Sequence, residues 1–238
     1  GTVDSTFNLD LNEQSGNRVD SLRVLADGRI LIGGSFVSLQ PAGSPARVTR
    51  RNFARINAAG TLDTGFDIAA GGATGGAVNA LAIQPDGKIV VGGAFADLGG
   101  AKAGNLARFH PEGSVDTEFG ASVGTDGPVN AIAVRANGAP VPTQLGGFAW
   151  LNRDGSLRAG FTPGAEANFR GNVKVSAVLP DGRVIVGGAF VNLSNVTSGN
   201  LARFNANGTL DTSFNPVIGG EVADLVAQAD GKIVIVGS

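Results

Sequence analysis

An internal repeat of about fifty residues constrains the fold of this chain more than any other feature. Four short signatures recur in a fixed order along the 238 residues. The first is an alternating apolar stretch, found at residues 19–25, 77–83, 128–134, 172–178 and 221–227. The second follows an Asp-Gly turn and reads DGRILIGGSF, DGKIVVGGAF, DGRVIVGGAF and DGKIVIVGS, starting at Asp27, Asp86, Asp181 and Asp230. The third reads NFARIN, NLARFH, FAWLN and NLARFN, at residues 52–57, 105–110, 148–152 and 200–205.

The fourth signature is typified by GTLDTSF, and it begins at residues 1, 60, 113, 155 and 208. Each signature has the length and the Val, Ile, Leu and Phe content of a β-strand, and Asp-Gly or Asn-Gly turns separate them. Four strands in hairpins cannot bury both faces alone, whereas units stacked around an axis can, as in a β-propeller. A linear β-solenoid is the alternative, but its coils of about 20–30 residues are shorter than this period.

We therefore predict an all-β, five-bladed β-propeller in a single domain over residues 1–238. Its repeat units are expected at residues 1–8 with 221–238, and at 19–66, 77–119, 128–161 and 172–214. The two ends of the chain together supply three of the four strands of one unit. That blade is then either completed by the N-terminal strand or left three-stranded, and Thr2–Phe7 should pair in the blade that holds residues 221–237.

A chain that starts at Gly1 and lacks methionine is expected to be a processed product or a segment of a longer repeat array. Exposed strand edges at an incomplete blade would also favour self-association.

The string PDGKIVVGGAF, followed by NLARF and GSVDTEF, resembles the delta-60 repeat family of bacterial β-propellers. The resemblance covers essentially the whole chain and recurs in every unit, with departures in the third. Members of that family are typically parts of large secreted or cell-surface bacterial proteins, and most have no assigned activity. The resemblance thus implies an extracellular or cell-surface module rather than a reaction.

A phenylalanine holds the same place in every fourth signature, at Phe7, Phe66, Phe119, Phe161 and Phe214. An aromatic ring of ligand platforms is one interpretation, but core anchors between blades are favoured, because large aromatic side chains dominate protein cores. The Gly-Gly pairs of the second signature lack the strand-to-helix context and the Lys-Ser/Thr of a phosphate-binding loop. They indicate a β-bulge or a close backbone approach instead.

A recurrent pair of charges is more informative. An arginine of the third signature precedes an aspartate of the fourth by eight residues in three units: Arg55 and Asp63, Arg108 and Asp116, and Arg203 and Asp211. Across a hairpin these side chains lie roughly opposite, which predicts structural Arg–Asp bridges; a ring of catalytic aspartates is the alternative. In the third unit both members change together, to Trp150 and Arg158, as a partnered bridge predicts.

The third unit is also the shortest. Trp150 follows Asn137 by 13 residues, whereas Arg108 follows Asp86 by 22. Pro140 and Pro142 fall where the second strand should run, so we expect that strand to be irregular or at a sheet edge.

Composition excludes several classes of function. A net charge of −2 and a pI near 5.4 provide no electrostatic footprint for nucleic acid, and no apolar run has the length of a membrane span. The absence of cysteine excludes disulfides and thiolate metal sites. A single histidine, His110, argues against a repeated His-based metal site or a Ser-His-Asp triad, and no calcium-loop spacing occurs. We expect no catalytic residues, no metal and no cofactor.

Three functions stay open. The favoured one is a non-catalytic structural or interaction module of adhesion type, displayed outside the cell and binding a protein or glycan partner. A lectin-like propeller would need an exposed aromatic residue, and Trp150, the single tryptophan, is the candidate ligand contact. A carbohydrate-active enzyme would need two carboxylates roughly 5–10 Å apart at the mouth of the central channel.

Overall fold

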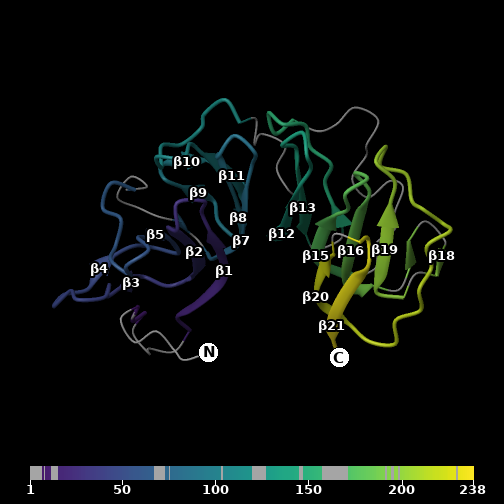
Figure 1. Ribbon diagram of the computed structural model, residues 1–238, viewed down its shortest axis with the longest axis horizontal. Helices are drawn as coiled ribbons and strands as arrows, with labels where there is room; N and C mark the ends of the chain where they lie inside the picture. The colour runs from purple at the N-terminus through teal and green to yellow at the C-terminus, as the bar shows by residue number, and fades with distance from the viewer. Residues whose placement is uncertain are drawn as a thin grey trace. The chain divides into compact units, whose positions relative to one another are not determined.

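The computed structural model describes residues 7, 9–11, 16–66, 73–74, 76–102, 104–119, 127–144, 147–156, 171–190, 192–193, 196–197, 199–228 and 230–238. This part of the chain contains strands and turns and no helix (Figure 1). It divides into two compact units, formed by residues 1–83 with 87–117 and by residues 84–86 with 118–238. The all-β expectation is confirmed, whereas one domain over residues 1–238 stays a prediction.

The first compact unit contains two three-stranded antiparallel sheets with the same strand order. They consist of β1 (Arg18–Val24), β2 (Ile30–Ser35) and β5 (Phe53–Ile56), and of β7 (Val78–Ile83), β8 (Ile89–Gly93) and β11 (Leu106–Phe109). The first three signatures form the three strands, and the second signature lies in the middle. Short strands pair in the connections: β3 (Ser38–Leu39) with β4 (Val48–Thr49), and β9 (Asp97–Leu98) with β6 (Ala73–Thr74) and β10 (Ala101–Lys102).

The second compact unit repeats this plan with variations. Its sheets consist of β12 (Val129–Val134), β13 (Pro140–Gln144) and β14 (Gly147–Phe148), then of β15 (Gly171–Val178), β16 (Val184–Phe190) and β19 (Leu201–Phe204), and then of β20 (Val222–Ala227) and β21 (Ile233–Gly237). The connection after β16 holds the short pair β17 (Asn192–Leu193) and β18 (Val196–Thr197). The described sheets match the repeat units, but they do not establish a closed ring of five blades.

The fourth signature forms a single β-bridge rather than a full strand, which corrects the expectation of four strands per unit. Leu62 bridges to Ile56, and the same bridge joins Val115 to Phe109 and Leu210 to Phe204. The chain turns directly afterwards because the Gly65 N–H donates to Asp63 Oδ1 and the Phe66 N–H donates to the Asp63 carbonyl.

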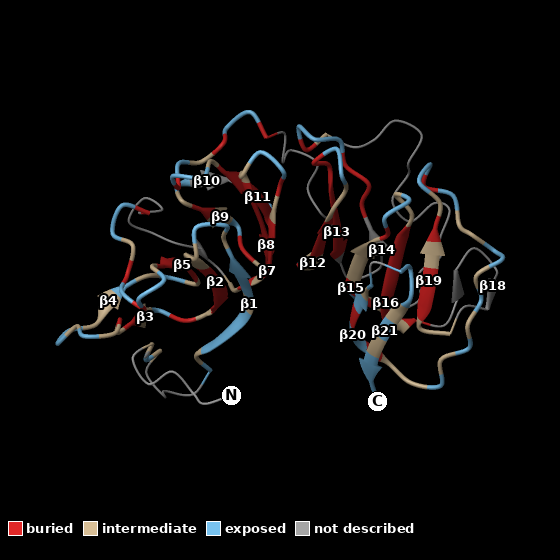
Figure 2. Cartoon of the chain, in the orientation of Figure 1, coloured by how far each residue is buried: buried red, intermediate tan, exposed pale blue. Residues whose placement is uncertain are grey.

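Apolar clusters lie between consecutive sheets. In the first compact unit Leu31 and Phe53 of one sheet pack with Leu81 of the next, and in the second compact unit Ile185 packs with Val222. The buried strands appear as red segments inside each unit (Figure 2). Sheets that share such apolar layers face to face are the architecture of a β-propeller.

In two of the Gly-Gly pairs the first glycine receives a valine from the next sheet. A Cβ atom on Gly33 would lie 2.5 Å from Val78 Cγ1, and one on Gly187 would lie 2.7 Å from Val222 Cγ1. Real Cβ atoms do not approach other atoms so closely, and an extra carbon in a well-packed core is itself destabilising. Glycine at these positions therefore sets the distance between neighbouring sheets.

The second glycine lies opposite a β-bulge in the first strand. A Cβ on Gly34 would lie 2.1 Å from the Arg18 carbonyl oxygen, and the register of β1 shifts between Val19 and Ser21. The other first strands shift at the matching place: Val78/Ala80, Val129/Ala131, Val173/Val175 and Val222/Asp224. The Gly-Gly pairs thus provide the close approach and the bulge that the sequence indicated.

The second strand of the third repeat unit is neither irregular nor at a sheet edge, which corrects the prediction drawn from its prolines. β13 lies between β12 and β14. The Ala149 N–H donates to the Pro142 carbonyl at 3.0 Å, and the Leu151 N–H donates to the Pro140 carbonyl. Two prolines spaced by two residues can be accommodated because each still contributes its acceptor to the ladder.

The expected pairing of Thr2–Phe7 with residues 221–237 lies outside the described residues, apart from Phe7 itself. Phe7 packs, with Leu9 and Leu11, against the apolar cluster of the β1–β2–β5 sheet.

Candidate functional site

The structure brings together all three Arg–Asp pairs that the eight-residue spacing singled out. In each pair the arginine Nε donates to the aspartate Oδ2 at 2.8 Å. The aspartate N–H also donates to the carbonyl of its arginine, so the backbone fixes the pair as well. Arg55, Arg108 and Asp116 are each at most 5% exposed. Pairs of this kind are far from the solvated surface ion pairs that contribute little.

A second cation reaches the same carboxylate, and this contact was not predicted from the sequence. Arg29 Nη1 lies 3.1 Å from Asp63 Oδ2, Lys88 Nζ lies 2.8 Å from Asp116, and the matching Arg183 Nη1 lies 3.7 Å from Asp211. These cations are the residues that follow the Asp-Gly turn of the second signature. The signal was present in the sequence, because the third unit replaces this cation by Ala139 as well as losing the pair.

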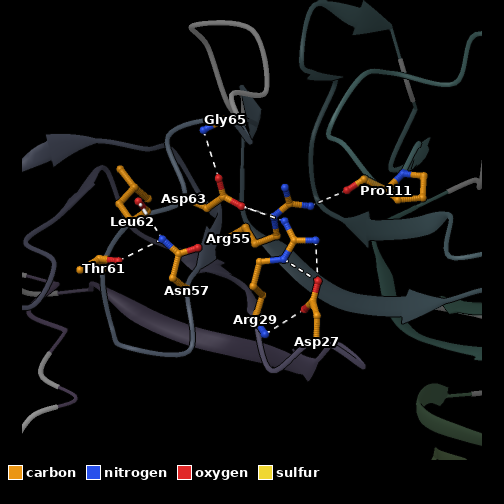
Figure 3. A network of polar contacts seen from close by, with 9 residues as sticks. All are labelled: Asp27, Arg29, Arg55, Asn57, Thr61, Leu62, Asp63, Gly65 and Pro111. Atoms are coloured by element: carbon orange, nitrogen blue, oxygen red, sulfur yellow. Dashed lines mark hydrogen bonds and ion pairs between the residues drawn. The ribbon is translucent and has the colours of Figure 1, made fainter.

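The network of the first unit shows how these contacts connect the chain (Figure 3). The Asp63 carboxylate lies between Arg29 and Arg55, while Arg29 also contacts Asp27 of its own turn. Arg55 Nη1 donates to the carbonyl of Pro111, which belongs to a turn of the neighbouring sheet. Arg55 therefore connects its own strand and the fourth signature to the next sheet.

The arginines also lie over the repeated phenylalanines. The Arg55 guanidinium carbon is 4.1 Å from the Phe66 ring centroid, and that of Arg203 is 4.4 Å from the Phe214 ring. Cations placed over an aromatic face gain further stabilisation. The arginine thus contacts the carboxylate of the fourth signature and its phenylalanine together.

Hydrogen bonding keeps these carboxylates ionised. Burial alone would raise the pKa of Asp63, but hydrogen bonds from Arg55 and Arg29 outweigh it, so the pKa of Asp63 lies below its usual value. The Ser213 hydroxyl, followed by Arg203, likewise lowers the pKa of Asp211. A carboxylate held in this way accepts hydrogen bonds and does not release a proton near neutral pH, so it is poorly suited to general acid catalysis.

Trp150 belongs to the core and not to a ligand surface. Its side chain has no exposed area and packs with Val141 and Phe204 between the third-unit and fourth-unit sheets. The Arg135 guanidinium lies 5.1 Å from its ring. A ring without an exposed face cannot present itself to a sugar, and this result replaces the assignment of Trp150 as a ligand contact. Arg158 lies outside the described residues.

The repeated phenylalanines lie against a glycine of the following unit. A Cβ on Gly113 would lie 2.8 Å from Phe66, and one on Gly155 would lie 2.7 Å from Phe119. Phe66 and Phe119 are buried, whereas Phe7 and Phe214 are partly buried. This placement is that of an anchor between units. Phe161 lies outside the described residues.

The asparagine that opens the third signature has a role that sequence reasoning missed. Asn52, Asn105 and Asn200 have positive φ angles of 65°, 72° and 63°. Asn200 Oδ1 accepts from the Phe190 N–H, and its Nδ2 donates to the carbonyl of Ile218, which leads into the next sheet. Asparagine tolerates this left-handed conformation better than most residues. Its recurrence at one place in three units was the available signal.

The bulges of the first strands aim polar side chains at the neighbouring first strand. In the second compact unit Asn130 Nδ2 donates to Asn172 Oδ1 at 2.9 Å, and Lys174 forms an ion pair with Glu221. Lys174 and Asp20, at the matching place in β1, are exposed. We call the bulge positions of the second compact unit, Asn130, Lys174 and Ala223, the bulge row.

The described residues contain no group of three or more His, Cys, Asp or Glu side chains suited to a metal ion. His110 lies in a turn, where its N–H donates to the Ser114 carbonyl. In the described residues no helix has the length and apolar character needed to cross a membrane.

Comparison with known proteins supports the architecture. Residues 25–66, 84–119 and 179–214 match the model of a β-propeller domain of unknown function, DUF5122. These segments are the second to fourth signatures of the first, second and fourth units, whereas the degenerate third unit is not matched. The chain has a β-propeller fold. A search of the curated proteins gave no significant match.

Solved structures support the same conclusion at low sequence identity. The WD40 β-propeller domain of Doa1 aligns over 96% of this chain with a TM-score of 0.53 and 14% identity. A catalytically inactive virginiamycin B lyase from Staphylococcus aureus, solved with quinupristin, aligns over 94% with a TM-score of 0.55 and 13% identity. A gluconolactonase from Xanthomonas campestris aligns over 92% with a TM-score of 0.53 and 17% identity.

The chain spans 62%, 65% and 69% of these three proteins, respectively, so it is less than two thirds of the first two. Proteins of different activity share this architecture, so these likenesses show the fold alone.

Proposed function

We propose that this chain is a non-catalytic β-propeller module that acts in structure or interaction outside the cell or at the cell surface. Five blades of delta-60 repeat type form the module in this proposal, and a protein or glycan is its partner. The resemblance of the repeated strings to delta-60 propellers supports the placement at the surface, and the match to a propeller domain of unknown function agrees with the repeat type.

The observation that carries the proposal is the use of the repeated charges. Asp63 and Asp116 each contact two cations, and Asp211 contacts Arg203 with Arg183 close by. A glycosidase needs one carboxyl group with a raised pKa to protonate its leaving group. The pKa values of Asp63 and Asp211 are lowered instead. The repeated aspartates are therefore suited to holding the repeats together and not to catalysis.

The bulge row is the best candidate for contact with a partner. Bulges direct side chains away from the regular alternation of a strand, and they are common near binding sites. Lys174 is exposed there, and its positive charge lies beside the carboxylate of Glu221. Polar side chains of this kind suit hydrogen bonding to a hydroxyl-rich or charged partner.

A glycan array probed with the labelled chain tests the proposal. We expect binding to one class of glycan or, when the array is silent, capture of a purified extracellular partner with a dissociation constant in the micromolar range or below. Lys174→Ala should weaken that binding, whereas Arg183→Ala, away from the bulge row, should leave it unchanged in folded protein.

Hydrolysis of any member of a glycoside panel, abolished by substitution of a carboxylate in the chain, would contradict the non-catalytic assignment. Equal binding by the Lys174→Ala variant would exclude the bulge row as the contact surface.

A further inference from the structure

The sheet of the third repeat unit, β12–β13–β14, has no glycine where it packs against the next sheet. Thr143 of β13 pairs with Ala131, at the place where Gly33 and Gly187 lie in their own second strands. The Thr143 side chain has no exposed area, and β15 of the following sheet packs against β13. We call the packed contact between two consecutive sheets a joint. At this joint a threonine occupies the space that glycine leaves open elsewhere.

A second exchange, on the facing strand, acts in the opposite direction. Ser176 of β15 pairs with Val186, and the residues at its place in the other first strands are large and apolar: Leu22, Leu81, Ile132 and Leu225. At the first joint the two places meet, because a Cβ on Gly33 would lie 3.4 Å from Leu81 Cδ1. Threonine is larger than glycine and serine is smaller than leucine, so the two exchanges offset each other in volume. We call Thr143 and Ser176 the exchange pair.

The exchange pair places two hydroxyl groups in an otherwise apolar layer. Ser176 Oγ is buried and, in the described part of the chain, has no hydrogen-bond partner. Thr143 Oγ1 donates to the Ala131 carbonyl at 3.4 Å, which is longer than an ordinary hydroxyl hydrogen bond. A buried hydroxyl without a good partner destabilises the folded state. The glycine and leucine of the first joint avoid this loss, so stability does not explain the exchange pair.

Size makes this joint incompatible with the others. A sheet with leucine at the place of Ser176 would overpack against Thr143, and Ser176 facing a glycine would leave a cavity. The valine of the joint does not discriminate between sheets, since Val173 takes the same place as Val78 and Val222. Discrimination at this joint therefore depends on the exchange pair.

We propose that the exchange pair determines the order of the sheets: it selects the fourth sheet as the neighbour of the third and excludes the other sheets, in this chain and in a second copy of it. Similar repeats can assemble in the wrong order or between chains, because their apolar layers are alike. Selection of this kind disfavours the wrong neighbour as well as fitting the right one. The inference concerns how the repeats assemble and does not depend on the proposed function.

Thermal melts of the full chain test the contact within the exchange pair. Ser176→Leu should lower the melting temperature by about 5 °C through overpacking, and Thr143→Gly by a similar amount through a cavity. The double variant rebuilds a glycine–leucine joint without a buried hydroxyl, so it should melt at or above the wild-type temperature. Losses that add up in the double variant would overturn the proposal.

A milder pair of changes keeps the test decisive where the larger ones prevent folding. Thr143→Ala and Ser176→Val shift the volumes in the same directions by fewer atoms. Each alone should lower the melting temperature, and their combination should recover most of the loss. A combination no more stable than the sum of its single variants predicts would again contradict the exchange.

Refolding tests the selection itself, which a merely well-packed joint would not affect. After dilution from urea at about 50 μM chain, the Thr143→Gly/Ser176→Leu variant should form a larger fraction of dimers and higher species than the wild type, although its native state is at least as stable. Size-exclusion chromatography with light scattering measures this fraction. Arg18→Ala, which leaves every joint intact, is the control and should refold as the wild type does. A double variant that refolds as cleanly as the wild type would overturn the ordering role.

Discussion

Because two cations surround each repeated aspartate, removal of the aspartate should destabilise the fold more than removal of one of its cations. Asp116 is the shared acceptor of Arg108 and Lys88, so its loss leaves two positive charges facing each other, one of them buried. Loss of Lys88 leaves the Arg108–Asp116 pair intact. Breaking a buried pair from one side is much more costly than removing an exposed charge, because the remaining charge stays desolvated.

We expect Asp116→Ala to lower the free energy of unfolding by about 3 kcal/mol, and Lys88→Ala by about 1 kcal/mol or less. Urea denaturation followed by tryptophan fluorescence and circular dichroism measures both. Arg18→Ala is the matched control: its ion pair with Asp20 is exposed and should contribute less than about 0.5 kcal/mol. Equal effects of Asp116→Ala and Arg18→Ala would contradict the structural role of the bridge.

The contact of Gly33 with Val78 can be tested by adding a single carbon atom between the two sheets. Gly33→Ala places a Cβ 2.5 Å from Val78 Cγ1, and we expect a loss of about 2 kcal/mol. Val78→Ala removes the opposing methyl groups, so the double variant should lose less than the sum of the two single variants. Gly127→Ala, where a Cβ would meet nothing within 4 Å, is the control. Additive losses would show that the two residues do not contact each other.

At the scale of the element, the turns and the strand alternation made the first three strands of each unit predictable. The bridge of Arg55 to Asp63 was predictable because the two residues lie eight apart on one hairpin. The contact of Arg29 with Asp63 spans 34 residues and forms only because β2 pairs with β5, so local spacing did not reveal it. The fourth signature read as a strand but ends after one bridge, since the Asp63 side chain competes for the backbone of its own turn.

The connection from β16 to β19 depends on a left-handed asparagine. Asn200→Gly keeps the φ of 63° accessible but removes the side-chain bonds to Phe190 and Ile218, whereas Asn200→Ala also forces a side chain into that conformation. We expect the free energy of unfolding to fall by about 1 kcal/mol in Asn200→Gly and by about 2 kcal/mol in Asn200→Ala. Thermal melts followed by circular dichroism give the order. An alanine variant as stable as the glycine variant would remove the conformational part of this explanation.

At the scale of the whole molecule, the repetition of one ionised network links the stability of the chain to pH. The pKa values of Asp63 and Asp211 are lower in the folded chain than in ordinary aspartate, so folding is favoured while both groups are charged. That contribution is fully present above the unfolded-state pKa of about 3.9 and is lost as the pH falls through the folded values.

We expect the free energy of unfolding to vary little between about pH 7 and pH 5, as far as the aspartates determine it, and to fall steeply below about pH 4. Chemical denaturation at a series of pH values measures this dependence. Asp63→Asn should be less stable at pH 7 but show a shallower fall in acid, because one linked proton is gone. A variant whose acid slope equals that of the wild type would exclude Asp63 as a source of the dependence.

The glycine–valine joint between sheets also has a genetic consequence. Gly33 meets Val78 and Gly187 meets Val222 in the same geometry, so the two halves of this joint lie at fixed places in the repeat. A duplication of one full period that includes such a glycine, wherever its breakpoints fall, then carries both halves of the joint with it. Repeat number can therefore change by unequal recombination without new core mutations. The exceptions are Thr143 and Val236, which take the place of the glycine in the third and fifth repeats.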